Sequence, residues 1–223
     1  MEGRMKGSSS RGSAKRATKT ECEWSISADY STPSGFTTVT ASTGCGSPSG
    51  LGDTCPTSFL GIDPGKSGGM CAVWVSGDKI TLVETLKFDR PMNEVMQFTS
   101  RLRLAPCGGT MMEICHTMPR DGRCSAFAFG ENYGFWKGML STQGHRISYL
   151  TPQEWQKAVA ALLNLGPVPK EKKQRKRLFV EAARRIGVTK PTLAVADAAM
   201  LALCMMAASV GGKRLKAILS NIN

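Results

Sequence analysis

The chain lacks the paired cysteines that mark the common zinc-binding motifs. Its eight cysteines lie at irregular spacings, and no CxxC pair occurs. A zinc set of Cys107, Cys115, His116 and Cys124 remains as an alternative, although this spacing fits no common zinc finger. Free thiols in a reducing compartment are the simpler interpretation.

Histidine and acidic residues are also scarce. His116 and His145 are the only histidines, so a two-histidine metal site is expected only if the fold brings them together. Asp and Glu number 17 against 29 Lys and Arg, which gives a formal net charge of +12 in 223 residues. Most of this charge follows residue 57, where 23 basic residues face 12 acidic ones. This favours a polyanionic partner such as DNA, with a merely soluble basic protein as the alternative.

The first 57 residues have no periodic apolar pattern, and twenty of them are Ser or Thr. They are predicted to be disordered, ahead of a folded domain at 58–212 and a short basic tail at 213–223. The first nineteen hold six Lys or Arg and one acid, which is typical of a chloroplast or mitochondrial transit peptide. The alternatives are a basic arm that touches DNA in an intracellular, nucleoid-associated protein, and a segment added artificially.

Short strand-like runs and helical patterns alternate after residue 57. Strands are predicted at 59–63, 70–75, 79–88, 110–115 and 146–150, and helices at 92–104, 131–142, from 151 onward, 170–186 and 193–210. Gly68-Gly69 and Ser76-Gly77-Asp78 supply turns, so the first three strands form an antiparallel meander. The last helix has one charged residue, and its Ala-rich composition favours packing on a sheet over spanning a membrane. The predicted class is α/β, with a mixed central sheet flanked by helices.

Three acidic residues stand in apolar settings on different predicted elements. Asp63 ends an apolar run before Pro64-Gly65, Glu113 lies in the strand at 110–115, and Asp197 lies in the helix at 193–210. An unpartnered carboxylate is costly to bury, whereas hard cations prefer carboxylate oxygens. Convergence on Mg²⁺, with Mn²⁺ as an alternative, predicts a metal-dependent enzyme acting on nucleic acid. The ordinary alternatives are a turn residue at 63, an edge-strand residue at 113 and an ion pair at 197.

A basic run is predicted to contact DNA phosphates. Six of the eight residues from 170 to 177 are Lys or Arg. The predicted phosphate contacts are Lys66, Lys170, Lys172, Lys173, Arg175, Lys176 and Arg177. A solvated helix face and a nuclear-targeting signal are the alternatives for this run.

An aromatic run follows at 129–140. The aromatic residues proposed for a core, a dimer interface or a junction contact are Phe129, Tyr133, Phe135 and Trp136. Core or dimer packing is the preferred interpretation, and insertion at unstacked bases is the alternative. Gly130, Gly134 and Gly138, spaced by four, leave one helix face nearly bare and favour a close helix–helix approach across a dimer.

Ordered motifs recur across residues 58–206. They are FLGIDPGKSGG at 59–69, MME at 111–113 and ADA at 196–198. Together they resemble the RuvC-type Holliday junction resolvases. FGENYGFWKGML at 129–140 and TPQEWQK at 151–157 look closer still to the phage and chloroplast (monokaryotic chloroplast resolvase-like) branch. The opening motif also resembles that of sugar kinases and actin-like ATPases, so an ATPase stays as an alternative function.

The resemblance implies a ribonuclease H-like fold, a homodimer and two Mg²⁺ ions held by four acidic or His ligands. Asp63 would bridge the ions, and Glu113 and Asp197 would complete their shells. The implied activity is endonucleolytic resolution of four-way DNA junctions, giving 5′-phosphate and 3′-hydroxyl ends. No membrane partner is expected.

The sequence departs from this family's pattern just before the last acid. The family has Asp, Glu or His three or four residues before it, where this chain has Leu193 and Ala194. A three-ligand site should hold a second ion more weakly. Glu131 and Asp121 are substitutes on sequence proximity alone. The alternative function is therefore a catalytically weakened junction-binding protein with the same fold.

Overall fold

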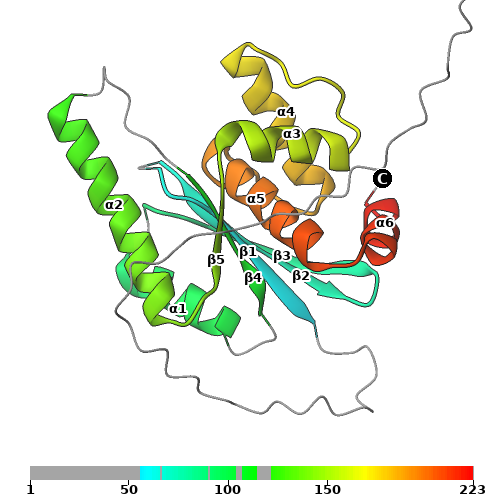
Figure 1. The fold of residues 1–223 in the computed structure, drawn as a ribbon, viewed down its shortest axis with the longest axis horizontal. Helices are drawn as coiled ribbons and strands as arrows, with labels where there is room; N and C mark the ends of the chain where they lie inside the picture. Colours follow the sequence, from blue (N-terminus) through cyan, green and yellow to red (C-terminus); the bar gives the residue numbers. More distant parts are fainter. Residues whose placement is uncertain (1–55, 66, 90, 104–106, 115–121, 223) are drawn as a thin grey trace, which may run out of the picture. The chain divides into compact units, whose positions relative to one another are not determined.

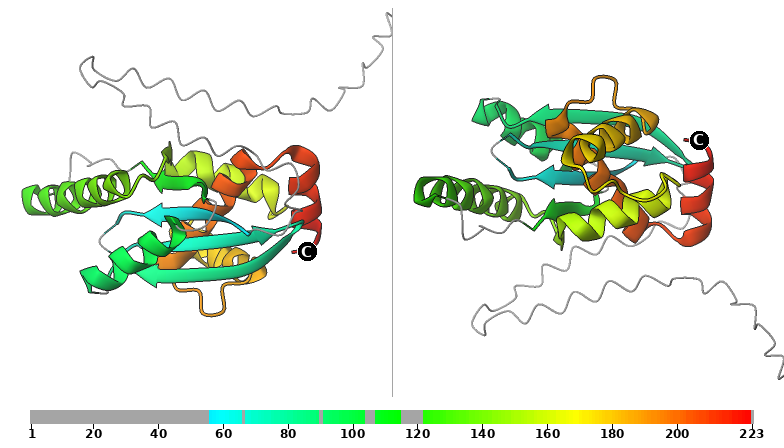
Figure 2. Two further views of the ribbon diagram at one scale, coloured as in Figure 1. Left: turned by 90° about the horizontal axis from the view of Figure 1, so that it is seen from below. Right: turned by 90° about the horizontal axis from the view of Figure 1, so that it is seen from above.

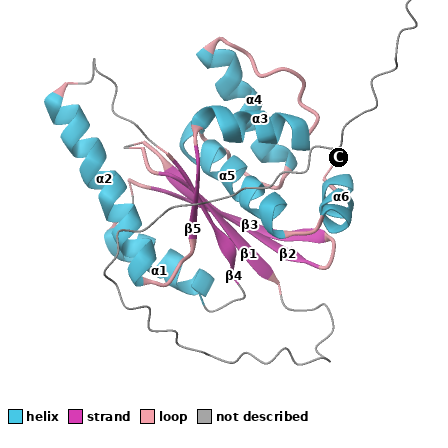
Figure 3. Cartoon of the chain, in the orientation of Figure 1, coloured by secondary structure: helices cyan, strands magenta, loops and turns pink. Residues whose placement is uncertain are grey.

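The structure is a computed structural model that describes residues 56–222 apart from 66, 90, 104–106 and 115–121. A five-stranded sheet with helices on both faces forms the centre of this part (Figures 1 and 3). Its strands are β1 (Thr57–Asp63), β2 (Gly69–Ser76), β3 (Lys79–Lys87), β4 (Cys107–Glu113) and β5 (Ile147–Leu150). The predicted leader up to residue 55, Lys66, Cys115, His116 and Asp121 lie outside the described residues.

The strand order is β3-β2-β1-β4-β5, with β1 at the centre. β2 runs antiparallel to β1 and β3, whereas β4 is parallel to both β1 and β5. This order, with β2 alone reversed, is that of a ribonuclease H-like fold. The predicted α/β class, mixed sheet and antiparallel meander are therefore confirmed.

The helices divide between the two faces of the sheet. They are α1 (Met92–Arg103), α2 (Arg123–Thr142), α3 (Pro152–Leu162), α4 (Lys172–Arg185), α5 (Leu193–Ser209) and α6 (Gly212–Ser220). Alternate residues of β1 point to opposite faces. Phe59 packs in the layer of α3, α4 and α5, whereas Leu60 and Ile62 pack in the layer of α1 and α2 (Figure 1).

Helix α5 packs directly on the centre of the sheet. A Cβ atom at Gly61 of β1 would lie 2.0 Å from the Ala198 oxygen and 2.2 Å from the Ala202 nitrogen, so glycine is required there. Small residues on α5 complete this close approach, which fixes where its one acid falls. No helix in the described ranges is both long and apolar enough to cross a membrane.

Helix α2 begins at Arg123, eight residues before its predicted start at 131. Its buried residues are Trp136, Met139 and Leu140, all in the second half. The first half therefore lacks the apolar periodicity by which a helix is recognised in sequence. Both views in Figure 2 show this half extending past the ends of the strands.

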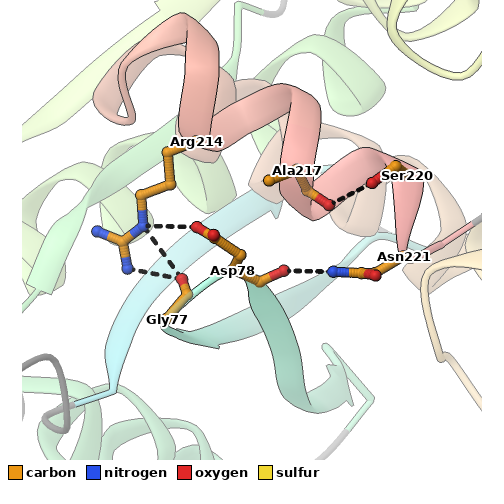
Figure 4. Close-up of polar contacts among 6 residues, drawn as sticks. All are labelled: Gly77, Asp78, Arg214, Ala217, Ser220 and Asn221. Carbon is orange, nitrogen blue, oxygen red and sulfur yellow. Dashed lines mark hydrogen bonds and ion pairs between the residues drawn. The ribbon is translucent and has the colours of Figure 1, made fainter.

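The predicted basic tail contains helix α6, which is fastened to the β2–β3 hairpin (Figure 4). Arg214 donates to the Gly77 oxygen from Nη2 at 2.8 Å and from Nε at 3.1 Å, and its Nε lies 3.8 Å from Asp78 Oδ1. Asn221 Nδ2 donates to the Asp78 backbone oxygen at 2.9 Å. Ile218 is buried in the core, so α6 also has an apolar side that packs on the domain.

Candidate metal centre

Asp63 and Asp197 lie in one hollow at the carboxyl end of the central strand. Asp63 is the last residue of β1, and Asp197 stands in the second turn of α5. The hollow has a volume of about 490 Å³ and is also lined by Lys87, Lys176 and Thr192. The fold therefore brings together two of the three acids that the sequence singled out.

The turn after β1 is built around the Asp63 carboxylate. The Gly65 backbone N–H donates to Asp63 Oδ1 at 3.0 Å, and the Gly68 N–H donates to the Gly65 oxygen at 2.8 Å. Asn132 of α2 donates from Nδ2 to the Pro64 oxygen. The loop is thus tied to the projecting helix, a role for Asn132 that no sequence pattern indicated.

Burial raises the pKa of both aspartates. For Asp63, desolvation outweighs the lowering of the pKa by the Gly65 hydrogen bond and the Lys176 charge. For Asp197, desolvation and then the negative charge of Asp63 raise the pKa to about 6, against the lowering effects of Lys176 and Arg175. The negative charge in this hollow is therefore incompletely compensated by the protein's own groups.

Glu113 ends β4, the parallel neighbour of β1. Ile62 pairs with Met112, so Asp63 and Glu113 come next in register and point to the same face of the sheet. Glu113 does not line the hollow, however, and its Oε2 accepts a hydrogen bond from Trp155 Nε1 at 2.6 Å. Within the described residues, no group of three His, Cys, Asp or Glu is arranged to hold a metal. An ion shared by all three acids stays a prediction.

The donor set of the hollow fits one hard divalent cation. Asp63 and Asp197 provide carboxylate oxygens, and Thr192 Oγ1 is buried without a hydrogen-bond partner among the described residues. Mg²⁺ is commonly bound by one or two carboxylates and keeps several waters. Leu193 and Ala194 also line the hollow, and their side chains offer no donor for a second ion. Glu131 is exposed on α2 and does not line the hollow.

No family model matches this chain, and no curated protein matches it. Two similar solved structures are of RuvC from Thermus thermophilus. The one in complex with a Holliday junction substrate is 17% identical, with a TM-score of 0.43, and the match covers 69% of this chain and 95% of that chain. The other RuvC structure is 16% identical, with a TM-score of 0.40 and the same coverage of both chains.

Lysines from two different segments line the hollow of the acidic pair. Lys176 and Lys87 line the hollow from α4 and from the end of β3. Lys87 and Thr192 also line an adjoining hollow of about 480 Å³, together with Lys190. Sequence reasoning missed Lys87, Lys190 and Thr192, because none of them lies in a basic run or a recognisable motif.

The residues of the predicted basic run differ in their surroundings. Lys170, Lys172, Lys173 and Arg177 are exposed, whereas Lys176 is half-buried and borders the acidic pair. Arg175 Nη1 donates to the Pro169 and Lys170 backbone oxygens at 3.2 and 3.0 Å. Arg175 therefore holds the loop before α4, while the exposed residues remain available for solvent or phosphate.

The predicted aromatic residues of α2 separate into core and surface. Trp136 is 2% exposed and stacks on Phe88 at 3.8 Å between ring centroids, and Phe135 packs edge-on to it at 5.1 Å. Phe129 and Tyr133 stack at 6.5 Å and are half-buried. Phe127, which the sequence analysis did not select, is 74% exposed. Trp136 therefore lies in the core, and Tyr133 and Phe135 pack against it, whereas a dimer or junction contact by this helix stays a prediction.

The described members of the alternative zinc set, Cys107 and Cys124, and the described histidine, His145, do not line this hollow. Cys107 and Cys124 are free, exposed thiols. The buried His145 ring lies 3.2 Å from Thr110 Oγ1 at Nδ1 and 3.4 Å from the Thr99 oxygen at Nε2. His145 thus bridges α1 and β4, which is a structural role.

Proposed function

We propose that this protein is a divalent-metal-dependent DNA endonuclease that resolves four-way junctions, in the phage and chloroplast branch of the RuvC-type resolvases. One observation carries the proposal: Asp63 and Asp197, both with a raised pKa, share a hollow bordered by lysines at the end of the central strand. Asp63 and Asp197 would hold a Mg²⁺ or Mn²⁺ ion, which when bound would supply charge stabilisation for phosphodiester hydrolysis.

The side chains around the hollow have different roles in binding the cation and the DNA. Asp63 and Asp197 hold the cation, and the half-buried positions of both carboxylates limit competition from water. Lys87 and Lys176 attract the scissile phosphate to the same place. The exposed lysines at the start of α4 bind flanking phosphates, which favours binding at low salt. The products carry 5′-phosphate and 3′-hydroxyl ends.

The proposal includes a homodimer formed through α2. Cβ atoms at Gly130, Gly134 and Gly138 would meet nothing within 4 Å, and Phe127 beside them is largely exposed. A bare, small-residue face permits another helix to approach closely. A twofold dimer would present two equivalent sites, as symmetric nicking of a junction requires.

Cleavage of a synthetic four-way junction tests the activity. Purified protein is incubated with the junction in Mg²⁺ or Mn²⁺, beside the Asp63→Asn variant and a linear duplex of the same sequence. We expect paired nicks in the junction with the wild type and none with the variant. ATP hydrolysis without junction affinity would instead select the actin-like ATPase class.

A junction-binding protein with weakened catalysis is the second candidate. It is favoured because Leu193 and Ala194 line the hollow with side chains that cannot bind a metal ion. The described residues lining the hollow therefore supply two carboxylates. Junction binding without cutting in either metal would select it over the nuclease. Sedimentation of the free protein across a concentration series tests the dimer separately. A monomer at every concentration would contradict an α2 interface.

A further inference from the structure

The hollow around Asp63 and Asp197 contains two lysines, Lys87 and Lys176, and lacks a third acid among the described residues that line it. Two-ion phosphodiesterase sites need carboxylates or equivalent ligands enough to offset two dications. Here two carboxylates are available, and Leu193 and Ala194 face the hollow one helical turn before Asp197. The residues present therefore disagree with the two-ion site that the sequence resemblance implies.

Lys176 is the cation of α4 that borders this acidic pair. It is half-buried and lines the hollow, and its charge acts on both Asp63 and Asp197. Its basic neighbours are placed differently. Lys173 is exposed, and the Arg175 guanidinium is hydrogen-bonded to backbone oxygens of the preceding loop. The ammonium of Lys176 is thus positioned by the fold of α4 against α5.

We propose that the hollow takes one divalent cation, and that the Lys176 ammonium supplies the positive charge that a second ion provides in a two-ion site. This inference rests on the proposed nuclease function and names how that site is built. Two carboxylates balance one dication, so the ammonium groups of Lys176 and Lys87 leave positive charge for a phosphodiester oxygen. A second dication would be repelled by the first ion and by the ammonium groups. Among the described residues that line the hollow, no further carboxylate is present to offset this repulsion.

The proposal gives Lys176 a defined task toward the substrate. A lysine ammonium is a compact point charge with three donors, and it suits a non-bridging phosphate oxygen. No proton transfer by Lys176 is required, because its contribution is electrostatic. Thr192 also lines the hollow, and its Oγ1 is buried without a hydrogen-bond partner among the described residues.

Counting Mn²⁺ ions per chain tests the proposal on the full-length protein. Free and bound Mn²⁺ are separated by electron paramagnetic resonance during a titration, in the absence of DNA. We expect one ion per wild-type chain. Lys176→Glu adds a carboxylate where the ammonium stood, and it should bind a second ion or bind Mn²⁺ at least tenfold more tightly. Lys173→Glu, with the same change in net charge on the exposed side of α4, should match the wild type.

A second variant separates an electrostatic role from a structural one. Lys176→Gln keeps most of the side-chain length and removes the charge that repels the ion. We expect Mn²⁺ to bind about fivefold more tightly, while junction cleavage falls at least a hundredfold. A lysine that merely packs α4 would give weaker Mn²⁺ binding together with lower thermal stability.

The outcomes distinguish this inference from the proposed function. Two Mn²⁺ ions per wild-type chain, no Mn²⁺ binding, or equal effects of Lys176→Glu and Lys173→Glu would overturn the one-ion site. Efficient cutting by a two-ion wild type would leave the nuclease function standing and reject this inference. A third outcome would reject the nuclease function and keep the one-ion site. In it, the wild type binds one Mn²⁺ ion per chain and Lys176→Gln binds Mn²⁺ more tightly, but no junction is cut.

Discussion

Replacing Asp197 by Asn should stabilise the metal-free protein at neutral pH. The pKa of Asp197 is raised to about 6 by desolvation and by the charge of Asp63, so its ionised form is disfavoured in the folded state. Relative to an ordinary value of 3.8, this shift corresponds to about 3 kcal/mol of free energy of unfolding, as an upper figure. Asn keeps the size of the side chain and removes the charge. We expect a gain of about 1–3 kcal/mol at pH 7.5.

The pH dependence has a defined sign. Because the folded-state pKa lies above the unfolded one, the folded protein binds more protons than the unfolded chain between about pH 4 and pH 6. Wild-type stability should therefore fall as pH rises through this window. The advantage of Asp197→Asn should be full above about pH 6 and should shrink as pH falls through this window, because below about pH 4 the wild-type carboxyl becomes protonated in both states.

Urea unfolding followed by tryptophan fluorescence measures this difference, at pH 4.5 and at pH 7.5 in the presence of a chelator. Glu131→Gln, an equal charge change on the exposed surface of α2, serves as the control and should leave stability unchanged. Added Mg²⁺ should stabilise the wild type more than Asp197→Asn, since the ion compensates the buried charge. A variant less stable than the wild type at pH 7.5, or a difference that does not change with pH, would refute this account of the hollow.

Three further substitutions test the fold and the basic surroundings of the site. Gly61→Ala should lower the free energy of unfolding by about 3 kcal/mol or more, because its Cβ would overlap α5 backbone atoms. Gly212→Ala, which has open space around it, should have little effect in the same urea titration. Arg214→Ala should lower the melting temperature, measured by calorimetry, by a few degrees, because its contacts with the β2–β3 hairpin are lost. An unchanged melting temperature would mean that these exposed contacts contribute nothing to stability. Lys87→Ala combined with Lys190→Ala should reduce the slope of log affinity against log salt for junction binding by about 2, and an unchanged slope would exclude both residues from phosphate contact.

The local patterns of the sequence predicted most of the elements. The Gly and Ser-Gly-Asp turns separate three short strand-like runs, so β1, β2 and β3 were predictable as an antiparallel meander. The Thr151-Pro152 start of α3 was also predictable, and the structure adds a reciprocal pair of hydrogen bonds between Thr151 and Glu154. The first half of α2 was missed because it has no buried residues to create an apolar period. Helix α6 was also missed, although Leu215, Ile218, Leu219 and Ile222 recur at helical spacing and pack on the core.

The sequence by itself singled out three acids, because a carboxylate inside an apolar run is costly without a partner. It could not decide which of them share a hollow. That depended on the close packing of α5 over Gly61, which brings Asp197 beside Asp63, and on Trp155, which holds the Glu113 carboxylate on the same face of the sheet. The residues around this pair come from separate segments of the chain, so only the tertiary structure brings them together. They are Lys87, Lys176, Lys190 and Thr192. Their electrostatic effect depends on distance and burial, which no spacing along the chain specifies.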